Sequence, residues 1–208
     1  MRFQEGKIVK ALEHFEIYNK SHPNDPFVLY HIGACHYLMK STDQAIDVLK
    51  QCLKIDPQYQ DANFDLGLIS FEREHYRDAI ACFKKIASKR KDHFETHFFY
   101  ARALLAVGQN EKAIKEFQHC LKLREDDAQT KAFLGMAHYE LGQYQDALEN
   151  LELSLFKWGK EPMVHYDLAM VYLKMNRIED AQRERQLLVE MDPAKALNLA
   201  CEIANTDK

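Results

Sequence analysis

The sequence is poor in the residues that interrupt helices. It has seven glycines and five prolines in 208 residues, and no glycine- and serine-rich linker divides it. No stretch approaches the roughly 18 consecutive apolar residues that a membrane-spanning helix needs, and we expect no signal peptide before the folded region. Because 47% of the residues are apolar and 11% aromatic, the composition favours a helical protein with an ample core.

Cysteine pairs are also missing. The five cysteines are odd in number, scattered along the chain, and never arranged as Cys-x-x-Cys. A disulfide framework or a zinc site would use regularly spaced pairs. We therefore expect buried thiols in a reducing compartment, which predicts a cytoplasmic location and leaves a periplasmic one open. These cysteines are Cys35, Cys52, Cys82, Cys120 and Cys201.

An excess of positive charge is absent as well. Lysine and arginine total 28 against 32 aspartates and glutamates, so the net charge is −4. Nucleic-acid binding depends on neutralising phosphates, and this balance argues against it. The one strong basic run, within residues 84–91, is either a docking patch or localisation signal, or a solvated helix end that the helix dipole favours. We prefer the solvated surface, because residues 125–127 are acidic one repeat later.

No arrangement of residues indicates catalysis. His93, Glu95 and His97 approach a zinc-protease pattern, but that pattern needs Glu directly after the first His, where this chain has Phe94. His31, Cys35 and His36 also suggest a metal site, since His31 and Cys35 lie one helical turn apart. Cys35 and His36 occupy packing positions of their helix, so we interpret them as a packed thiol and a histidine at the edge of the core. Without a nucleophile–base constellation or a glycine-rich phosphate loop, we expect no metal, no cofactor and no enzymatic activity. An enzyme would need a catalytic domain outside these residues.

A period of 34 residues runs through the chain. It is marked by six alanines, by a second row of small residues, and by a large residue four positions after most of the alanines. The alanines are Ala11, Ala45, Ala79, Ala113, Ala147 and Ala181, and the second row is Gly33, Gly67, Ala101, Gly135 and Ala169. Small residues at these places would let two helices touch, with Leu49, Phe83, Phe117 and Leu151 filling the space around the contact. This pattern resembles the tetratricopeptide repeat, and the resemblance covers almost the whole chain.

The resemblance implies an all-α fold, a right-handed α-solenoid of 34-residue helix-turn-helix repeats forming a superhelix. We expect a single solenoid domain over residues 1–208. Its full repeats are predicted at residues 26–59, 60–93, 94–127, 128–161 and 162–195. Residues 1–25 would hold a partial repeat with only its second helix, from residue 7 to about residue 20. Residues 196–205 would form a C-terminal capping helix.

The turn inside each repeat has its own pattern. Gly6, Gly108, Gly142 and Asn176 share the position between the two helices, where a left-handed residue closes the first helix. Lys40 and Glu74 stand at the same position in the other two repeats. We expect those two turns to close differently.

The resemblance also implies where a partner binds. In the family the first helix of each repeat lines the concave wall, and partners usually bind there. The inward positions, spaced by three or four residues, are Tyr30, His31, Phe64, Leu68, Phe98, Phe99, Arg102, Phe133, Met136, Tyr166 and Met170. The family commonly has Asn at two positions of each repeat where this chain has the apolar residues Leu68, Phe99, Phe133, Met136 and Met170 in several repeats. We predict a nearly continuous stripe that holds an apolar peptide or helix, oriented by Arg102. The alternative is that these side chains only pack neighbouring helices together.

The best-known ligand of the family does not fit this stripe. Co-chaperone members grip a terminal carboxylate with inward Lys, Asn and Arg residues. Here Arg102 and Lys174 stand among Asp65, Glu72, Glu140 and Asp167, so we expect no chaperone tail held by a carboxylate clamp.

The functional hypothesis is a non-catalytic scaffold or adaptor that binds a protein partner. The alternative is a structural module that self-associates through its solenoid edges, or that forms the repeat part of a larger protein. Without a preceding first helix, Ile8, Leu12 and Phe15 would lack their usual partners. We expect this edge to contact a second copy, or residues absent from this chain.

Overall fold

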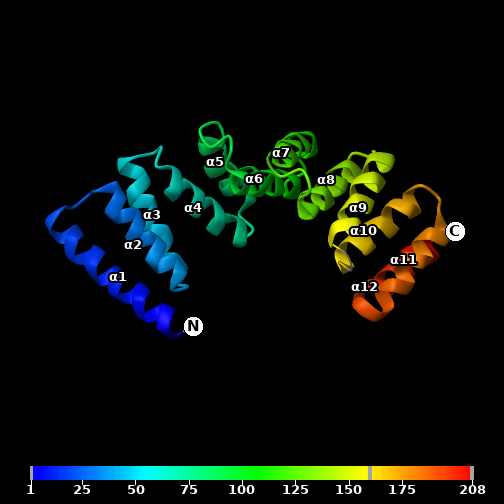
Figure 1. Ribbon diagram of the computed structural model, residues 1–208, viewed down its shortest axis with the longest axis horizontal. Helices are drawn as coiled ribbons and strands as arrows, with labels where there is room; N and C mark the ends of the chain where they lie inside the picture. Colours follow the sequence, from blue (N-terminus) through cyan, green and yellow to red (C-terminus); the bar gives the residue numbers. More distant parts are fainter. Residues whose placement is uncertain (1, 159–160, 207–208) are drawn as a thin grey trace. The chain divides into compact units, whose positions relative to one another are not determined.

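The computed structural model describes residues 2–158 and 161–206, and over these residues it contains helices and no strand. The helices, shown in Figure 1, are α1 (Arg2–Ser21), α2 (Pro26–Leu38), α3 (Thr42–Ile55), α4 (Gln60–Glu72), α5 (Tyr76–Ala87), α6 (Phe94–Ala106), α7 (Asn110–Leu123), α8 (Ala128–Glu140), α9 (Tyr144–Trp158), α10 (Pro162–Lys174), α11 (Ile178–Met191) and α12 (Pro193–Thr206). The prediction of an all-α fold is confirmed. No described helix is long and apolar enough to cross a membrane.

Helix pairs repeat at a constant interval. The first helices of five pairs, α2, α4, α6, α8 and α10, begin at residues 26, 60, 94, 128 and 162, which are 34 residues apart. The two helices of several pairs pack side by side, for example α2 with α3 and α8 with α9 (Figure 1). The predicted 34-residue helix-turn-helix repeat is therefore present.

The chain divides into two compact units, residues 1–103 and residues 104–208, and the division falls within α6. The prediction of one solenoid domain with the repeat boundaries given above stays a prediction.

Close contact within the pairs explains the small residues of the repeat. A Cβ atom added at Gly33 would lie 2.8 Å from Cγ of Leu49, and one added at Gly135 would lie 2.7 Å from Cγ of Leu151. Leu49 and Leu151 are fully buried. The glycine lets the large side chain of the second helix rest on the backbone of the first, and this fixes the distance between the two helices.

The turns inside the pairs share one geometry, whatever residue stands there. Glu74 has φ 61° and Lys40 has φ 62°, close to Gly142 at 73°. In each turn the N–H of the residue after the left-handed one donates to a carbonyl near the end of the first helix. In one of them, the N–H of His75 donates to the carbonyl of Ser70 at 2.8 Å. The prediction that Lys40 and Glu74 close their turns differently is wrong, because satisfying the last carbonyls of the helix outweighs the steric cost of a left-handed residue.

The first turn position behaves differently from the prediction too. Gly6 is exposed and lies inside the continuous helix α1, with nothing within 4 Å of an added Cβ. The predicted left-handed residue at Gly6 is therefore wrong. No helix packs before it within the described residues, so no turn forces that conformation.

The core of the first unit begins between α1 and α2. Leu12 is buried against Val28, Ile32 and Cys35 of α2. Ile8 and Phe15 pack against the same cluster, so Ile8, Leu12 and Phe15 find apolar partners on α2 even without a first helix of their own. The reason is that α2 belongs to the following pair and offers α1 an apolar side of its own. The expectation that this edge contacts a second copy, or residues absent from this chain, stays a prediction.

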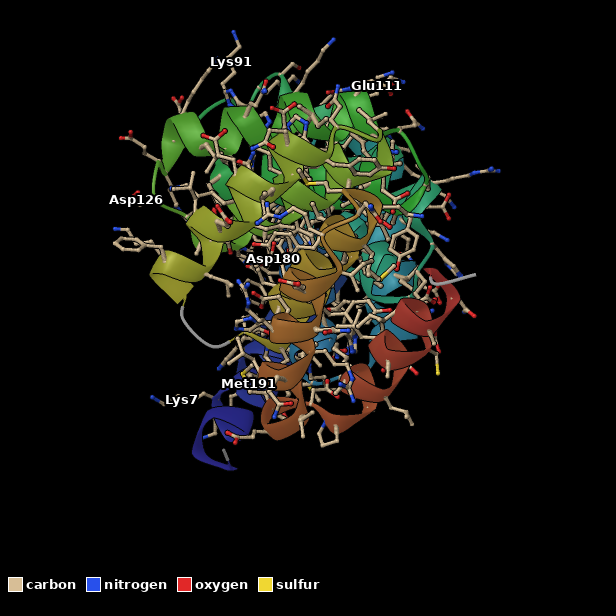
Figure 2. All side chains as sticks on the ribbon, turned by 90° about the vertical axis from the view of Figure 1, so that its right-hand side faces the viewer. Lys7, Lys91, Glu111, Asp126, Asp180 and Met191 are labelled. Carbon is tan, nitrogen blue, oxygen red and sulfur yellow. The ribbon has the colours of Figure 1, made fainter. Side chains whose placement is uncertain are left out.

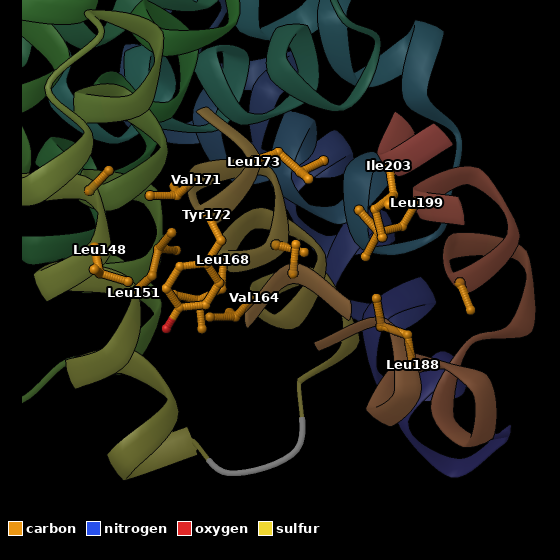
Figure 3. Packing of buried hydrophobic residues seen from close by; sticks show 14 of the residues in the cluster. Leu148, Leu151, Val164, Leu168, Val171, Tyr172, Leu173, Leu188, Leu199 and Ile203 are labelled. Carbon is orange, nitrogen blue, oxygen red and sulfur yellow. The ribbon is translucent and has the colours of Figure 1, made fainter. Parts of the chain in front are cut away.

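The core of the second unit lies between α9, α10, α11 and α12. Leu148 and Leu151 of α9 face Val164, Leu168 and Tyr172 of α10, and Leu188 of α11 lies near Leu199 and Ile203 of α12 (Figure 3). Helix α12 packs on both α10 and α11 and thereby covers their apolar residues.

Four of the five cysteines are buried, as expected for packed thiols, whereas Cys201 is exposed on α12. Burial raises the pKa of the thiols of Cys52 and Cys120, to about 11 and about 12. These two groups are protonated near neutral pH and serve as small apolar side chains.

Candidate partner-binding site

A pocket opens in the second unit where α8 and α10 meet over α9. It has a volume of about 200 Å³ and is lined by Met136, Tyr139, Glu140, Leu151, Tyr166, Asp167 and Met170. The residues from α8 are three and four positions apart, and so are those from α10, so each helix presents one face to the pocket. Leu151 is fully buried and forms part of its floor.

Three of the predicted partner-binding residues come together in this pocket, namely Met136, Tyr166 and Met170. Phe133, one turn before Met136, does not join them. Its ring stacks on that of Phe117 at 6.0 Å, which gives it a role in packing α8 on α7.

Besides the buried Leu151, three further residues of the pocket were not predicted to bind a partner. Tyr139, Glu140 and Asp167 line it beside the methionines. Glu140 and Asp167 occupy inward positions in the repeat, but the sequence interpretation counted them only against a carboxylate clamp. Their position was the signal that could have identified them, since an inward acid favours a partner with a positive charge.

Asp167 is the unusual polar group of the pocket. Its Oδ2 atom is buried and has no hydrogen-bond partner among the described residues. Burial raises the pKa of this carboxyl to about 7, and the nearby charge of Lys195 acts in the opposite direction. A carboxyl group kept from water without a partner is held at an energetic cost.

The pKa values of the two tyrosines of the pocket are shifted in the same direction. Burial raises the pKa of both Tyr139 and Tyr166, and the negative charge of Glu202 on α12 adds to the effect. The positive charge of Lys195 is engaged with Asp192, whose Oδ2 lies 2.6 Å from its Nζ. The pocket therefore combines aromatic walls with an excess of acidic groups.

In the first unit, the predicted residues around Arg102 pack on one another. The Arg102 guanidinium lies over the ring of Phe71 at 4.7 Å, over Phe98 at 5.5 Å and over Phe99 at 5.6 Å. Phe98 is only 5% exposed. This cation–π cluster ties α4 to α6, so Arg102 has a structural task besides the ligand contact predicted for it.

Phe64 and Leu68 of α4 are half-buried beside this cluster. The Phe64 ring lies 5.2 Å from the ring of His93 and 5.9 Å from the guanidinium of Arg90. Arg90 also forms an ion pair with Asp61. One member of the basic run thus belongs to the packing of the first unit.

The rest of the basic run is on the surface. Lys84, Lys85, Lys89 and Lys91 are exposed, and the side chain of Lys91 projects outward from the ribbon (Figure 2).

The two histidines after the basic run, His93 and His97, contact backbone groups through their ring nitrogens. The backbone N–H of Thr96 donates to Nδ1 of His93 at 3.2 Å, and Nε2 of the buried His97 lies 3.2 Å from the carbonyl of Arg90. Within the described part of the chain, no group of three His, Cys, Asp or Glu side chains is placed to hold a metal ion.

Tyr30 and His31 lie at the other end of the first unit. The His31 ring stacks on Phe15 at 4.9 Å and meets the edge of Phe27 at 4.4 Å, and burial lowers its pKa. Tyr30 lies 5.4 Å from Tyr59. Burial and the charge of Asp65 raise the Tyr30 pKa to about 12. His31 therefore joins α1 to α2, while Tyr30 lies nearer the acidic residues of α4.

Comparison with known families gives three matches. The model of the anaphase-promoting complex, cyclosome, subunit 3, matches residues 72–154, and two tetratricopeptide-repeat models match residues 36–92 and 134–193. The tetratricopeptide repeat-containing protein trd-1 of Caenorhabditis elegans is 25% identical over 118 residues, which are 56% of this chain. This chain spans only 15% of the length of that relative.

Solved structures show the same fold. The crystal structure of YrrB, described as a TPR protein with an unusual peptide-binding site, superposes with a TM-score of 0.79 at 17% identity, over 90% of this chain and 98% of its own. A MamA structure gives a TM-score of 0.73 at 20% identity, over 82% and 93%. The 34-residue helix pairs, the matching repeat models and these folds agree: the chain belongs to the tetratricopeptide-repeat family.

Proposed function

We propose that this protein is a non-catalytic scaffold that binds a segment of another protein through the first helices of its repeats. The observation that carries the proposal is the pocket that Met136, Tyr166 and Met170 line together. Thioether and phenol side chains adapt to varied apolar surfaces, and they are common anchors of protein interfaces.

The family supports this function. Tetratricopeptide repeats commonly mediate contacts between proteins and generally lack catalysis of their own. YrrB, which has the same fold, carries a peptide-binding site according to its description. We extend peptide binding to this chain as a proposal, with an apolar peptide or helix as the partner and without a carboxylate-clamped tail.

The first unit offers fewer accessible residues for binding. Leu68 and Phe64 retain some exposure and remain candidates. Phe98 has almost no exposed surface, and His31 and Phe99 are engaged with neighbouring rings. In this unit the packing alternative accounts for most of the predicted stripe.

A pull-down with the immobilised chain, followed by mass spectrometry, tests the proposal. Met136→Glu places a charge at the apolar wall of the pocket, and Leu68→Glu places one at the half-buried Leu68 of the first unit. We expect Met136→Glu to lose the partner, since a central interface anchor typically contributes about 2 kcal/mol or more. Leu153→Glu is the matched control, because Leu153 is 45% exposed on α9 and lies outside the pocket.

Circular dichroism and melting must show that each variant is folded. A folded Met136→Glu, Leu68→Glu double variant that retains its partner at full strength would rule out this surface. Attention would then move to the second helices and the edges.

Self-association is the second candidate function, and one observation favours it. A hollow of about 440 Å³ at the junction of α1 and α2 is lined by Phe15, Tyr18, Phe27 and Val28, with His14 and Asp25. Phe27 is 55% exposed and Tyr18 46% exposed. Aromatic rings exposed around a hollow favour an apolar contact with a second copy of this chain.

A further inference from the structure

We propose that the pocket of the second unit selects a cationic side chain, lysine or arginine, from the bound segment and pairs it with Asp167. This inference rests on the proposed function, and it names the chemistry that the pocket would recognise. It does not require the first unit to take part in binding.

Asp167 is the group that a cationic side chain would pair with. It comes from α10, next to Tyr166 and one turn before Met170, and all three line the pocket. Its Oδ2 atom is shielded from water and has no hydrogen-bond partner among the described residues. An ammonium or guanidinium group entering the pocket would supply both the missing donor and the opposite charge.

The walls suit the rest of a lysine or arginine side chain. Met136 and Met170 offer apolar contact to the methylene stem, which such side chains bury while their charged heads stay with polar partners. Tyr139 and Tyr166 also line the pocket, and aromatic rings attract cations. The pocket has a volume of about 200 Å³, and a water molecule in the liquid takes about 30 Å³. The pocket could therefore hold several water molecules, or the end of a lysine or arginine side chain in their place.

The charges around the pocket have one dominant sign. Glu140 of α8 lines it, and Glu202 of α12 raises the pKa of Tyr139 and Tyr166. Lys195 opposes them, but its Nζ lies 2.6 Å from Oδ2 of Asp192. An acidic guest would meet like charge, and a purely apolar guest would leave Asp167 without a donor.

Nuclear magnetic resonance of the full chain with ¹³C-labelled methionine methyl groups tests the inference. The probes are butylguanidinium, its neutral counterpart butylurea, and pentanoate. We expect butylguanidinium to shift the methyl signals of Met136 and Met170 in a saturable way. Butylurea should bind at least about tenfold more weakly than butylguanidinium. Pentanoate should cause no saturable shift.

Variants identify the group responsible. Asp167→Asn should remove most of the preference for butylguanidinium over butylurea, while Glu149→Gln, which removes an exposed charge on α9, should leave it unchanged. Lys195→Gln should strengthen butylguanidinium binding if Lys195 competes for Asp167. If Asp167→Asn does not fold, the comparison of probes on the unmodified protein still decides.

Two results would overturn the inference. Equal binding of butylguanidinium and butylurea would show a pocket without charge selection, and no saturable shift with any probe would show that it takes no such side chain. The pull-down judges the proposed function separately, with Met136→Ala used beside Met136→Glu, because a carboxylate at position 136 would itself attract a cationic side chain. If these variants lose the partner in that pull-down but the two probes bind equally, the proposed function stands and only the cationic guest is rejected.

Discussion

Glu74 and Lys40 hold a backbone conformation that glycine adopts without strain in two other turns of the chain. Both have φ near 60°, as does Asn176 at 58°. For a residue with a Cβ this conformation costs about 1–2 kcal/mol. These residues therefore carry local strain that the hydrogen bonds of the turn offset.

Glycine at position 74 should relieve that strain. We expect Glu74→Gly to raise the free energy of unfolding by about 0.5–1 kcal/mol, because the steric gain exceeds the added entropy of the unfolded chain. The reverse change, Gly142→Glu, should lower it by a similar amount. Urea unfolding measures both, and a stability loss in Glu74→Gly would contradict this account of the turn.

Asp167 should make stability depend on pH. Its pKa is raised from 3.8 to about 7 in the folded chain, so the folded state binds more protons than the unfolded state between these values. Stability therefore falls as pH rises from about 4 to about 7, by at most about 4 kcal/mol at 1.4 kcal/mol per pKa unit.

Urea unfolding of Asp167→Asn between pH 4.5 and pH 8 tests this assignment. The variant should gain stability relative to the unmodified protein as pH rises, because it lacks the buried ionising group. Glu149→Gln controls for the loss of one negative charge. A difference that does not change with pH would mean that the Asp167 carboxyl is not held away from water.

At the scale of the helix, two kinds of element alternate. Second helices such as α5 bury one side, for example Ala79, Phe83 and Ile86, and expose Lys84 and Lys85 on the other. First helices such as α10 bury residues on several sides, because they pack between two second helices. The first helix therefore has fewer positions left for a partner than its sequence suggests.

The contact within a pair should tolerate little added volume. Ala79 and Ala147 are fully buried, and the carbonyl of Ala147 lies 3.1 Å from a Cβ added at Gly135. We expect Ala79→Leu and Ala147→Leu each to destabilise by about 1–3 kcal/mol through overpacking. Thermal melting measures the loss, with Gln145→Leu on the exposed side of α9 as the control. Unchanged melting in both variants would show that the helix contact is assigned wrongly.

At the scale of the whole molecule, the exposed edge of α1 and α2 bears on oligomerisation. Ile8, Leu12 and Phe15 face α2, so the exposed apolar side chains of this edge are others, Ile17 at 64% and Phe27 at 55%. We predict concentration-dependent self-association of the chain in sedimentation equilibrium, driven by burial of these side chains.

Phe27→Glu should shift that equilibrium toward the monomer. Phe156→Glu is the matched control, because Phe156 is 86% exposed on α9 in the other unit. A monomer at every accessible concentration, before any substitution, would exclude self-association. Equal weakening by both variants would place the contact elsewhere.

The sequence by itself determined the repeat and the existence of the helix pairs. Small residues like Ala147 and Gly135, with a large one like Leu151 beside them in most repeats, recur every 34 residues because the two helices of a pair pack closely at these positions. This constraint is local and steric, so it is visible in the order of residues. The same regularity placed Met136, Tyr166 and Met170 on one side of the first helices, and the pocket does contain them.

Only the tertiary structure decided which inward residues remain available. His31 and Phe133 are covered by rings from other helices, whereas Asp167 reaches the pocket without a hydrogen-bond partner among the described residues. Period and residue type show which side of its own helix a side chain occupies. They do not show which neighbouring side chain fills the space in front of it, because that depends on how each helix packs against the next.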